Sequence, residues 1–145
     1  KAVFERLVVI PPAAAHLPSL VGKGEIATNL FDAGLGITEM LQKVMPLMMM
    51  AVSSPKMNVL RKHADISAPF KRAVNDLFTR YCEGEVRAGR LRPVNGRLFA
   101  NTYLGAIMKY VTTEHVEGDR DPLTTPEFLR ELIDLLLRGA QPENS

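Results

Sequence analysis

Apolar residues recur at spacings of three and four along nearly the whole chain, which is the period of an α-helix. No alternating run of β-branched residues between turn residues indicates a strand. The predicted helices cover about Lys1–Val9, Glu25–Ser53, Met57–His63, Ala68–Ala88, Gly96–Glu117 and Pro126–Ala140. The pattern therefore predicts an all-α bundle of five to six helices that forms one domain over residues 1–145.

Residues with capping preferences mark several of the predicted helix ends. Ser67 is the predicted N-cap of the helix over Ala68–Ala88, and Gly89 is its predicted stop. Asn95 is expected to cap the next helix. Thr125 is expected to cap the last one, with a proline at its first position.

The last two predicted helices are apolar on more than one side. In the final helix, one stripe contains Phe128, Leu132, Leu135 and Leu136, and a second contains Leu129, Ile133 and Leu137. A surface helix needs an apolar stripe only about 100° wide to lie on one core. The wider pattern predicts a second partner, another copy of the chain, so we expect a homodimer. The residues expected at the dimer interface are Leu104, Ile107, Val111, Leu129, Leu132, Ile133, Leu136 and Leu137.

Five methionines fall within eleven residues of one predicted helix, from Met40 to Met50. Methionine is flexible and polarisable, so it suits surfaces that accept variable apolar shapes. Two interpretations are open: these side chains only fill the core, or some of them line a cavity for a small apolar or aromatic molecule. The residues expected to bind such a ligand are Leu41, Met45, Met48, Met49, Phe78, Tyr81, Leu104 and Met108, and Tyr81, Tyr103 and Asn101 could supply the polar groups that orient it.

We expect that ligand to be largely neutral. The sequence shows no obvious buried charged pair, and an isolated buried charge is costly.

Signatures of catalysis or metal binding are weak. His16, His63 and His115 lie far apart, and none has a second ligand one helical turn away. Cys82 is predicted to be a small buried side chain rather than a nucleophile. No nucleophile elbow, phosphate loop or dinucleotide fingerprint is present. We therefore expect no enzyme activity, no metal and no cofactor.

Composition and charge narrow the class of protein. The longest apolar run, Val44–Val52, is far shorter than the roughly 20 residues that span a bilayer, so no membrane association is expected. A single cysteine and the lack of a secretory signal favour a cytoplasmic protein. The net charge of +2 is uneven: Lys56–Arg97 holds ten Lys and Arg residues against four Asp and Glu residues. This basic segment leaves open an alternative function, a helical adaptor that binds an acidic protein partner.

Two stretches in the C-terminal half of the chain resemble a known family. FTRYCEGEVRAGRLRPVNGRLFANTYLGAIMKYV, within Phe70–Ala140, and FLRELIDLLLRGA resemble the C-terminal regulatory domain of TetR-family transcriptional repressors. Asn29–Pro55 is similar to the long kinked helix of that family, and Lys1–Val9 matches the start of the helix that leaves its DNA-binding unit. The helix-turn-helix unit itself has no counterpart in this chain.

The resemblance implies a function that agrees with the pattern of apolar residues. The last two helices would form a four-helix interface with those of a second copy, and the remaining helices would enclose an effector pocket. Effector binding would then alter the binding of operator DNA by the missing N-terminal domain.

Overall fold

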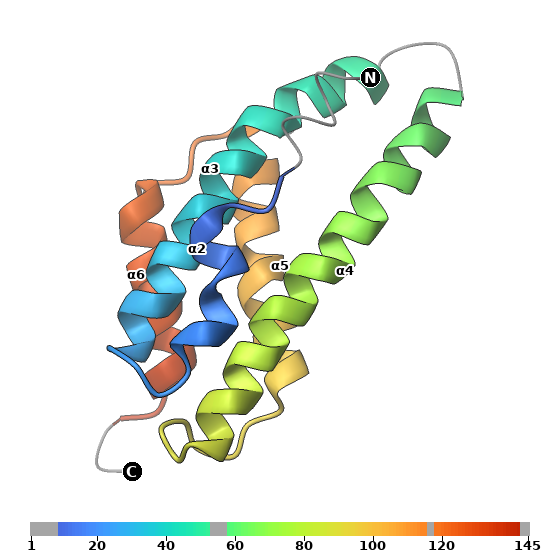
Figure 1. Ribbon diagram of the computed structural model, residues 1–145. Helices are drawn as coiled ribbons and strands as arrows, with labels where there is room; N and C mark the ends of the chain where they lie inside the picture. Colours follow the sequence, from blue (N-terminus) through green and yellow to red (C-terminus); the bar gives the residue numbers. More distant parts are fainter. Residues whose placement is uncertain (1–8, 53–57, 116–117, 143–145) are drawn as a thin grey trace.

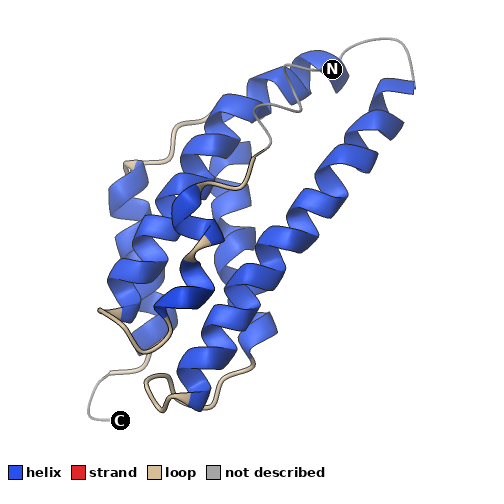
Figure 2. Ribbon diagram, viewed as in Figure 1, coloured by secondary structure: helices blue, strands red, loops and turns tan. Residues whose placement is uncertain are grey.

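The computed structural model describes residues 9–52, 58–115 and 118–142. Within these ranges every regular element is helical, as Figure 2 shows. The elements are α2 (Pro12–Ala15), the 3-10 helix η1 (Leu17–Leu20), α3 (Ile26–Val52), α4 (Asn58–Arg87), α5 (Gly96–His115) and α6 (Thr125–Arg138). The predicted all-α bundle of five to six helices is confirmed. The helix predicted over Lys1–Val9 lies outside the described residues except for Val9.

Helix α5 contacts each of the other long helices, α3 and α4, and also α6; Figure 1 shows it behind α3 and α4. Its buried residues are Gly96, Phe99, Ala100, Tyr103, Ile107, Tyr110 and Val111. They recur at spacings of three and four, so they form one stripe, which faces other helices of the same chain. Leu98, on the opposite side of α5, is 63% exposed. A second partner for α5 therefore stays a prediction.

Helix α4 is longer than the sequence predicts. The segments expected as a short helix over Met57–His63 and a separate helix from Ala68 form one continuous helix, with Pro69 inside it. The predicted N-cap at Ser67 is therefore wrong. Proline is favoured in the first turn of a helix but is also tolerated inside one at some cost, and the residues before Ser67 are compatible with a helix. Local sequence alone did not distinguish the two cases.

The ends of the other helices follow their capping residues. The Asn95 side chain accepts a hydrogen bond of 3.0 Å from the Leu98 N–H, as expected for a cap of α5. Gly89 follows the end of α4 with a φ of 75°, which suits glycine.

The N-cap of α6 is Thr124, not the predicted Thr125. Thr124 accepts from the backbone N–H of Glu127, whose carboxylate in turn accepts from the Thr124 N–H at 3.0 Å. This reciprocal pair is a capping box, which requires Glu or Gln three residues after the cap. Thr124 meets that requirement, whereas residue 128, three after Thr125, is Phe.

The segment from Pro11 to Val21 fills the space between α3 and α4 over one half of the bundle. Helix α2 and η1 contact both long helices, and Ala14 and Leu17 are fully buried there (Figure 1). The end of the segment packs closely on α4, since a Cβ added to Gly84 would lie 2.6 Å from Val21 Cγ2. This half of the bundle is consequently closed.

No helix among the described residues is both long enough and apolar enough to cross a bilayer.

Candidate functional site

A cavity of about 780 Å³ lies between α3, α4 and α5. Its α3 wall is one helical face, formed by Ile37, Met40, Leu41, Val44, Met45, Met48 and Met49. Leu104, Gly105, Met108, Asn101 and Thr112 line it from α5, and Phe70, Lys71, Arg72, Val74 and Asn75 line it from α4. The size is within the range of small-molecule sites, roughly 300–1,000 Å³, and most of the lining is apolar, as in such sites.

The cavity adjoins the place where Pro11 packs on α3. A Cβ added to Gly36 would lie 3.0 Å from Pro11. The cavity lining on α3 begins at the next residue, Ile37. The closed half and the cavity are therefore neighbours along α3.

The structure brings six of the eight predicted ligand-binding residues together in this cavity. These six are Leu41, Met45, Met48, Met49, Leu104 and Met108. Phe78 and Tyr81 do not line it. Both are fully buried in the closed half of the bundle.

Phe78 belongs to an aromatic core instead. Its ring lies 5.7 Å from that of Tyr103, measured between centroids. The Tyr103 hydroxyl donates a hydrogen bond of 2.7 Å to the carbonyl of Leu30, and a Cβ at Gly34 would overlap that hydroxyl. The absence of a side chain at Gly34 thus leaves room on α3 for the Tyr103 side chain of α5. Burial raises the pKa of Tyr103 above its usual value.

Tyr81 takes part in a buried polar cluster that the sequence did not predict. Its hydroxyl donates to the Glu85 carboxylate at 2.8 Å and accepts from Asn29 at 3.0 Å. Glu85, fully buried, also accepts from Arg90 at 3.1 Å and from the Gly22 N–H at 2.9 Å. Burial, above all, raises the pKa of Tyr81, and Glu85 adds to that effect. The cluster ties the loop before α3 to the end of α4, so its role is structural.

The polar side chains at the cavity differ from those expected. Of the predicted Tyr81, Tyr103 and Asn101, only Asn101 lines it. Lys71, Arg72 and Asn75 on α4 also line it and were not predicted. A signal was available, because these residues adjoin Phe70 and Val74 on the helix predicted to pack against the methionines.

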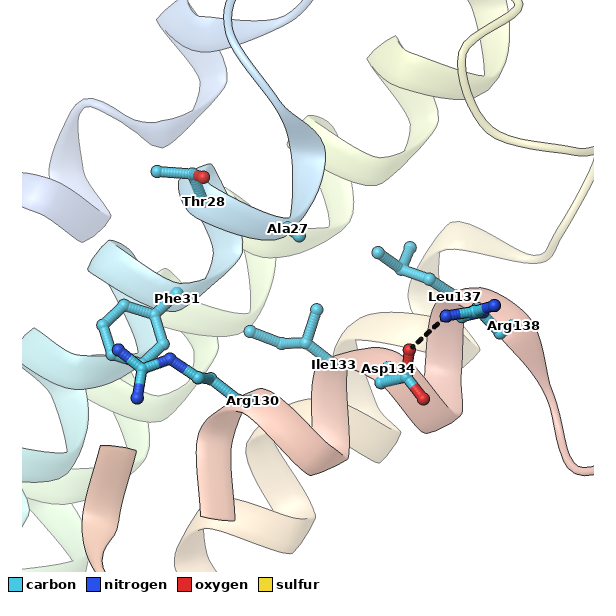
Figure 3. Close-up of a pocket in the computed structure, with 8 residues that line it drawn as sticks. All are labelled: Ala27, Thr28, Phe31, Arg130, Ile133, Asp134, Leu137 and Arg138. Atoms are coloured by element: carbon cyan, nitrogen blue, oxygen red, sulfur yellow. Dashed lines mark hydrogen bonds and ion pairs between the residues drawn. The ribbon is translucent and has the colours of Figure 1, made fainter. Parts of the chain in front are cut away.

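A second depression of about 580 Å³ lies between α3 and α6 (Figure 3). The guanidinium of Arg130 lies over the ring of Phe31, 4.9 Å from its centroid. Ile133 and Leu137 also line this depression, and Arg138 forms an ion pair of 3.4 Å with Asp134 at its edge. None of the eight predicted ligand-binding residues lies in this depression.

Four of the eight residues predicted at the dimer interface are buried inside the monomer. They are Ile107, Val111, Leu129 and Ile133. A fifth, Leu104, lines the cavity. The assignment of the four buried residues to a surface between two copies is wrong, because α5 and α6 use these sides to pack on α3 and on each other. For the half-buried Leu104 it stays a prediction. Leu132, Leu136 and Leu137 are half-buried, and Leu137 lines the second depression.

Candidate residues for other chemistry are scattered. His16 is exposed and His115 lies at the end of α5, while the side chain of His63 lies outside the description. Cys82 is fully buried, as expected, and burial with the nearby Glu85 and Glu83 charges raises the pKa of its thiol to about 12. Among residues 9–52, 58–115 and 118–142 no His, Cys, Asp and Glu side chains gather in a set that could hold a metal.

Comparison with known proteins found no matching family model, no similar curated protein and no similar solved structure.

Proposed function

We propose that this chain is the effector-binding and homodimerisation domain of a TetR-like transcriptional repressor. The observation that carries the proposal is the cavity between α3, α4 and α5, with its wall of methionines. Its volume of about 780 Å³ and its mostly apolar lining with a few polar groups are typical of small-molecule sites.

The sequence resemblance supplies the regulatory part of the proposal. Operator DNA would be contacted by a separate N-terminal helix-turn-helix domain, and the ligand would change the relative position of the two DNA-binding domains of a dimer. Such a switch requires that the ligand bind one arrangement more tightly than the other. The cavity is bounded by three different helices, so a ligand there would be sensitive to how they are arranged.

Ligand binding by the cavity can be tested with the neutral apolar dye Nile red. We expect its fluorescence to rise on binding, and we expect Met48→Glu to weaken binding by about tenfold or more, because a carboxylate would enter the apolar wall. Met50→Glu is the matched control. Met50 is on the same helix but is 71% exposed and does not line the cavity.

Two outcomes would contradict ligand binding at this site. One is the absence of any binding by the folded wild-type chain, and the other is an equal loss in both variants. Either result would favour the alternative function, an adaptor whose basic segment contacts an acidic protein.

The homodimer would use the side of α6 that the monomer leaves uncovered. Leu135 is 52% exposed, and its neighbours Leu132 and Leu136 are half-buried. An exposed apolar stripe of this kind is common where subunits meet. This surface is narrower than the one predicted, because the opposite side of α6 faces its own core.

Sedimentation velocity at micromolar concentration tests the dimer. We expect twice the monomer mass for the wild-type chain and a shift to monomer for Leu135→Arg, since a charge without a partner would lie in an apolar interface. Ala88→Arg, an exposed position at the end of α4, is the control and should remain dimeric. A monomeric wild-type chain would overturn the dimer without affecting the cavity.

A further inference from the structure

The charged side chains that line the cavity have one sign in the described part of the chain. Lys71 and Arg72 line it, both from α4, and no described Asp or Glu does. The sequence led us to expect a largely neutral ligand. The two cations bear on this expectation, because a positive charge at the cavity affects which ligand charge is favoured.

Neither cation has a carboxylate partner among the residues that the structure describes, in contrast to Arg80 and Arg90. Arg80, on the same helix, pairs with Asp76 at 2.9 Å, and Arg90 pairs with Glu85 at 3.1 Å. No such pair joins Lys71 or Arg72 to another residue in the described part of the chain. Their charge is therefore available to a ligand.

The polar side chains that line the cavity come from α4 and α5, where they lie beside apolar ones. Asn75 is four residues after Lys71, so the two side chains lie on the same side of α4. The wall on α3 is wholly apolar over its length from Ile37 to Met49. A ligand that satisfies both walls has one apolar part and one polar part.

We infer that the ligand of this cavity is an amphiphile with an anionic head group, of the fatty-carboxylate type. The apolar chain lies along the methionine wall of α3, and the head lies beside Lys71 and Arg72. This inference rests on the proposed function, since it presupposes that the cavity binds a small molecule.

The energetic objection to a charged ligand does not apply to this arrangement. Burying an isolated charge is costly, but Lys71 and Arg72 are exposed, so a head group beside them keeps part of its hydration. A guanidinium also forms paired, charge-assisted hydrogen bonds with a carboxylate. A cationic ligand would meet two like charges.

Titration calorimetry with decanoate, decan-1-ol and decyltrimethylammonium tests the head group directly. We expect decanoate to bind most tightly and the cationic amphiphile most weakly. In the double variant Lys71→Gln/Arg72→Gln, decanoate should bind about fivefold more weakly, a modest effect because exposed charges are screened, whereas decan-1-ol should change by less than about twofold. Shortening the acid to octanoate should weaken binding by about fourfold for each methylene removed.

Arg87→Gln/Arg92→Gln is the matched control for net charge. Both arginines are exposed, and neither lines the cavity. This variant should bind decanoate as the wild-type chain does. Equal losses in the two double variants, or binding of decan-1-ol at least as tight as that of decanoate, would overturn the anionic head group while leaving ligand binding intact. Failure of all three amphiphiles to bind would overturn the proposed ligand-binding function as well.

Vesicles separate a free amphiphile from a bilayer lipid. We expect any co-sedimentation of the protein with phosphatidylglycerol vesicles to be the same for the wild-type chain and for Met48→Glu. Vesicle binding lost in Met48→Glu, with no binding of free decanoate, would overturn the assignment to a free ligand.

Discussion

The same three long helices close tightly over one half of the bundle and leave a cavity in the other. In the closed half, the rings of Phe78 from α4 and Tyr103 from α5 contact each other, and residues 11–21 fill the space between α3 and α4. In the open half, α3 lines the cavity with methionines, and none of residues 11–21 is among the lining residues. The difference arises from what is placed between the helices rather than from the helices themselves.

The two halves also use polar groups differently. In the closed half, Tyr81, Asn29 and Glu85 hydrogen bond to one another in the interior, so their polarity is satisfied within the fold. In the open half, Lys71 and Arg72 lie at the cavity with no ion-pair partner in the described part of the chain. A satisfied polar cluster indicates a structural role, whereas unpaired cations beside a cavity indicate a binding role.

The largest expected effect compares an aromatic residue of the closed half with a methionine of the open half. Phe78→Ala should lower the free energy of unfolding by about 3–5 kcal/mol, because it leaves a void among fully buried neighbours. Met48→Ala should cost less than about 1 kcal/mol, because Met48 is half-buried and already borders a cavity. Urea denaturation at one protein concentration measures both, and equal losses would contradict the contrast between the halves.

Two helical glycines should respond to the same substitution with opposite signs. Gly34→Ala should destabilise the protein by about 1–3 kcal/mol, since the new Cβ displaces Tyr103 from its hydrogen bond to Leu30. Gly105→Ala should stabilise it by about 0.5–1 kcal/mol, because a Cβ there meets no atom within 4 Å and alanine favours the helix. Thermal or urea unfolding of the pair checks the sign, and destabilisation by Gly105→Ala would show that the open half is packed after all.

Alkaline pH should weaken the closed half through its buried acids. Burial raises the pKa of Cys82 to about 12 from 9.0, so the thiol ionises first in the unfolded chain. Its contribution to stability is complete below about pH 9 and is lost as pH rises toward 12, by at most about 1.4 kcal/mol per pH unit. Tyr81 and Tyr103, whose pKa values are also raised, act in the same direction at higher pH.

Unfolding measured between pH 8 and 11 tests this linkage. Cys82→Ala should show a shallower loss of stability with pH than the wild-type chain, although its stability at pH 8 is lower. An unchanged slope in this variant would mean that Cys82 is not protected from ionisation.

A local effect is expected at the start of α6, which does not line the cavity. Thr124→Ala should cost about 1 kcal/mol by removing the capping box, and should leave Nile red binding unchanged. Hydrogen bonds from Thr124 lower the pKa of Glu127, so this stabilisation is present above the ordinary pKa of a glutamate and is lost as pH falls through the lowered value. The stability of the variant should therefore change less with pH in this range than that of the wild-type chain, which acid unfolding measures. Weaker binding of Nile red by the variant would contradict the prediction, because it would show that α6 affects the cavity.

The amino-acid sequence by itself determined the helices and some of their ends. Helical periodicity depends on which residues follow one another, so α3, α5 and α6 match their predicted ranges to within a few residues. The Asn95 cap follows from its own side chain. The correct cap of α6 was also within reach of the sequence, since only Thr124 has a glutamate three residues later. The continuity of α4 through Pro69 was not, because the local signals suit either a helix start or an interior proline.

Only the tertiary structure decided what covers each apolar surface. Met48 and Phe78 are both apolar positions on helices that face the interior, yet Met48 borders the cavity while Phe78 packs on Tyr103. Ile107 and Ile133 were expected to meet a second copy of the chain and instead lie in the core. A periodic apolar pattern fixes the direction in which a side chain points from its helix. Whether it meets a ring, a cavity or solvent depends on neighbours that are distant in the sequence.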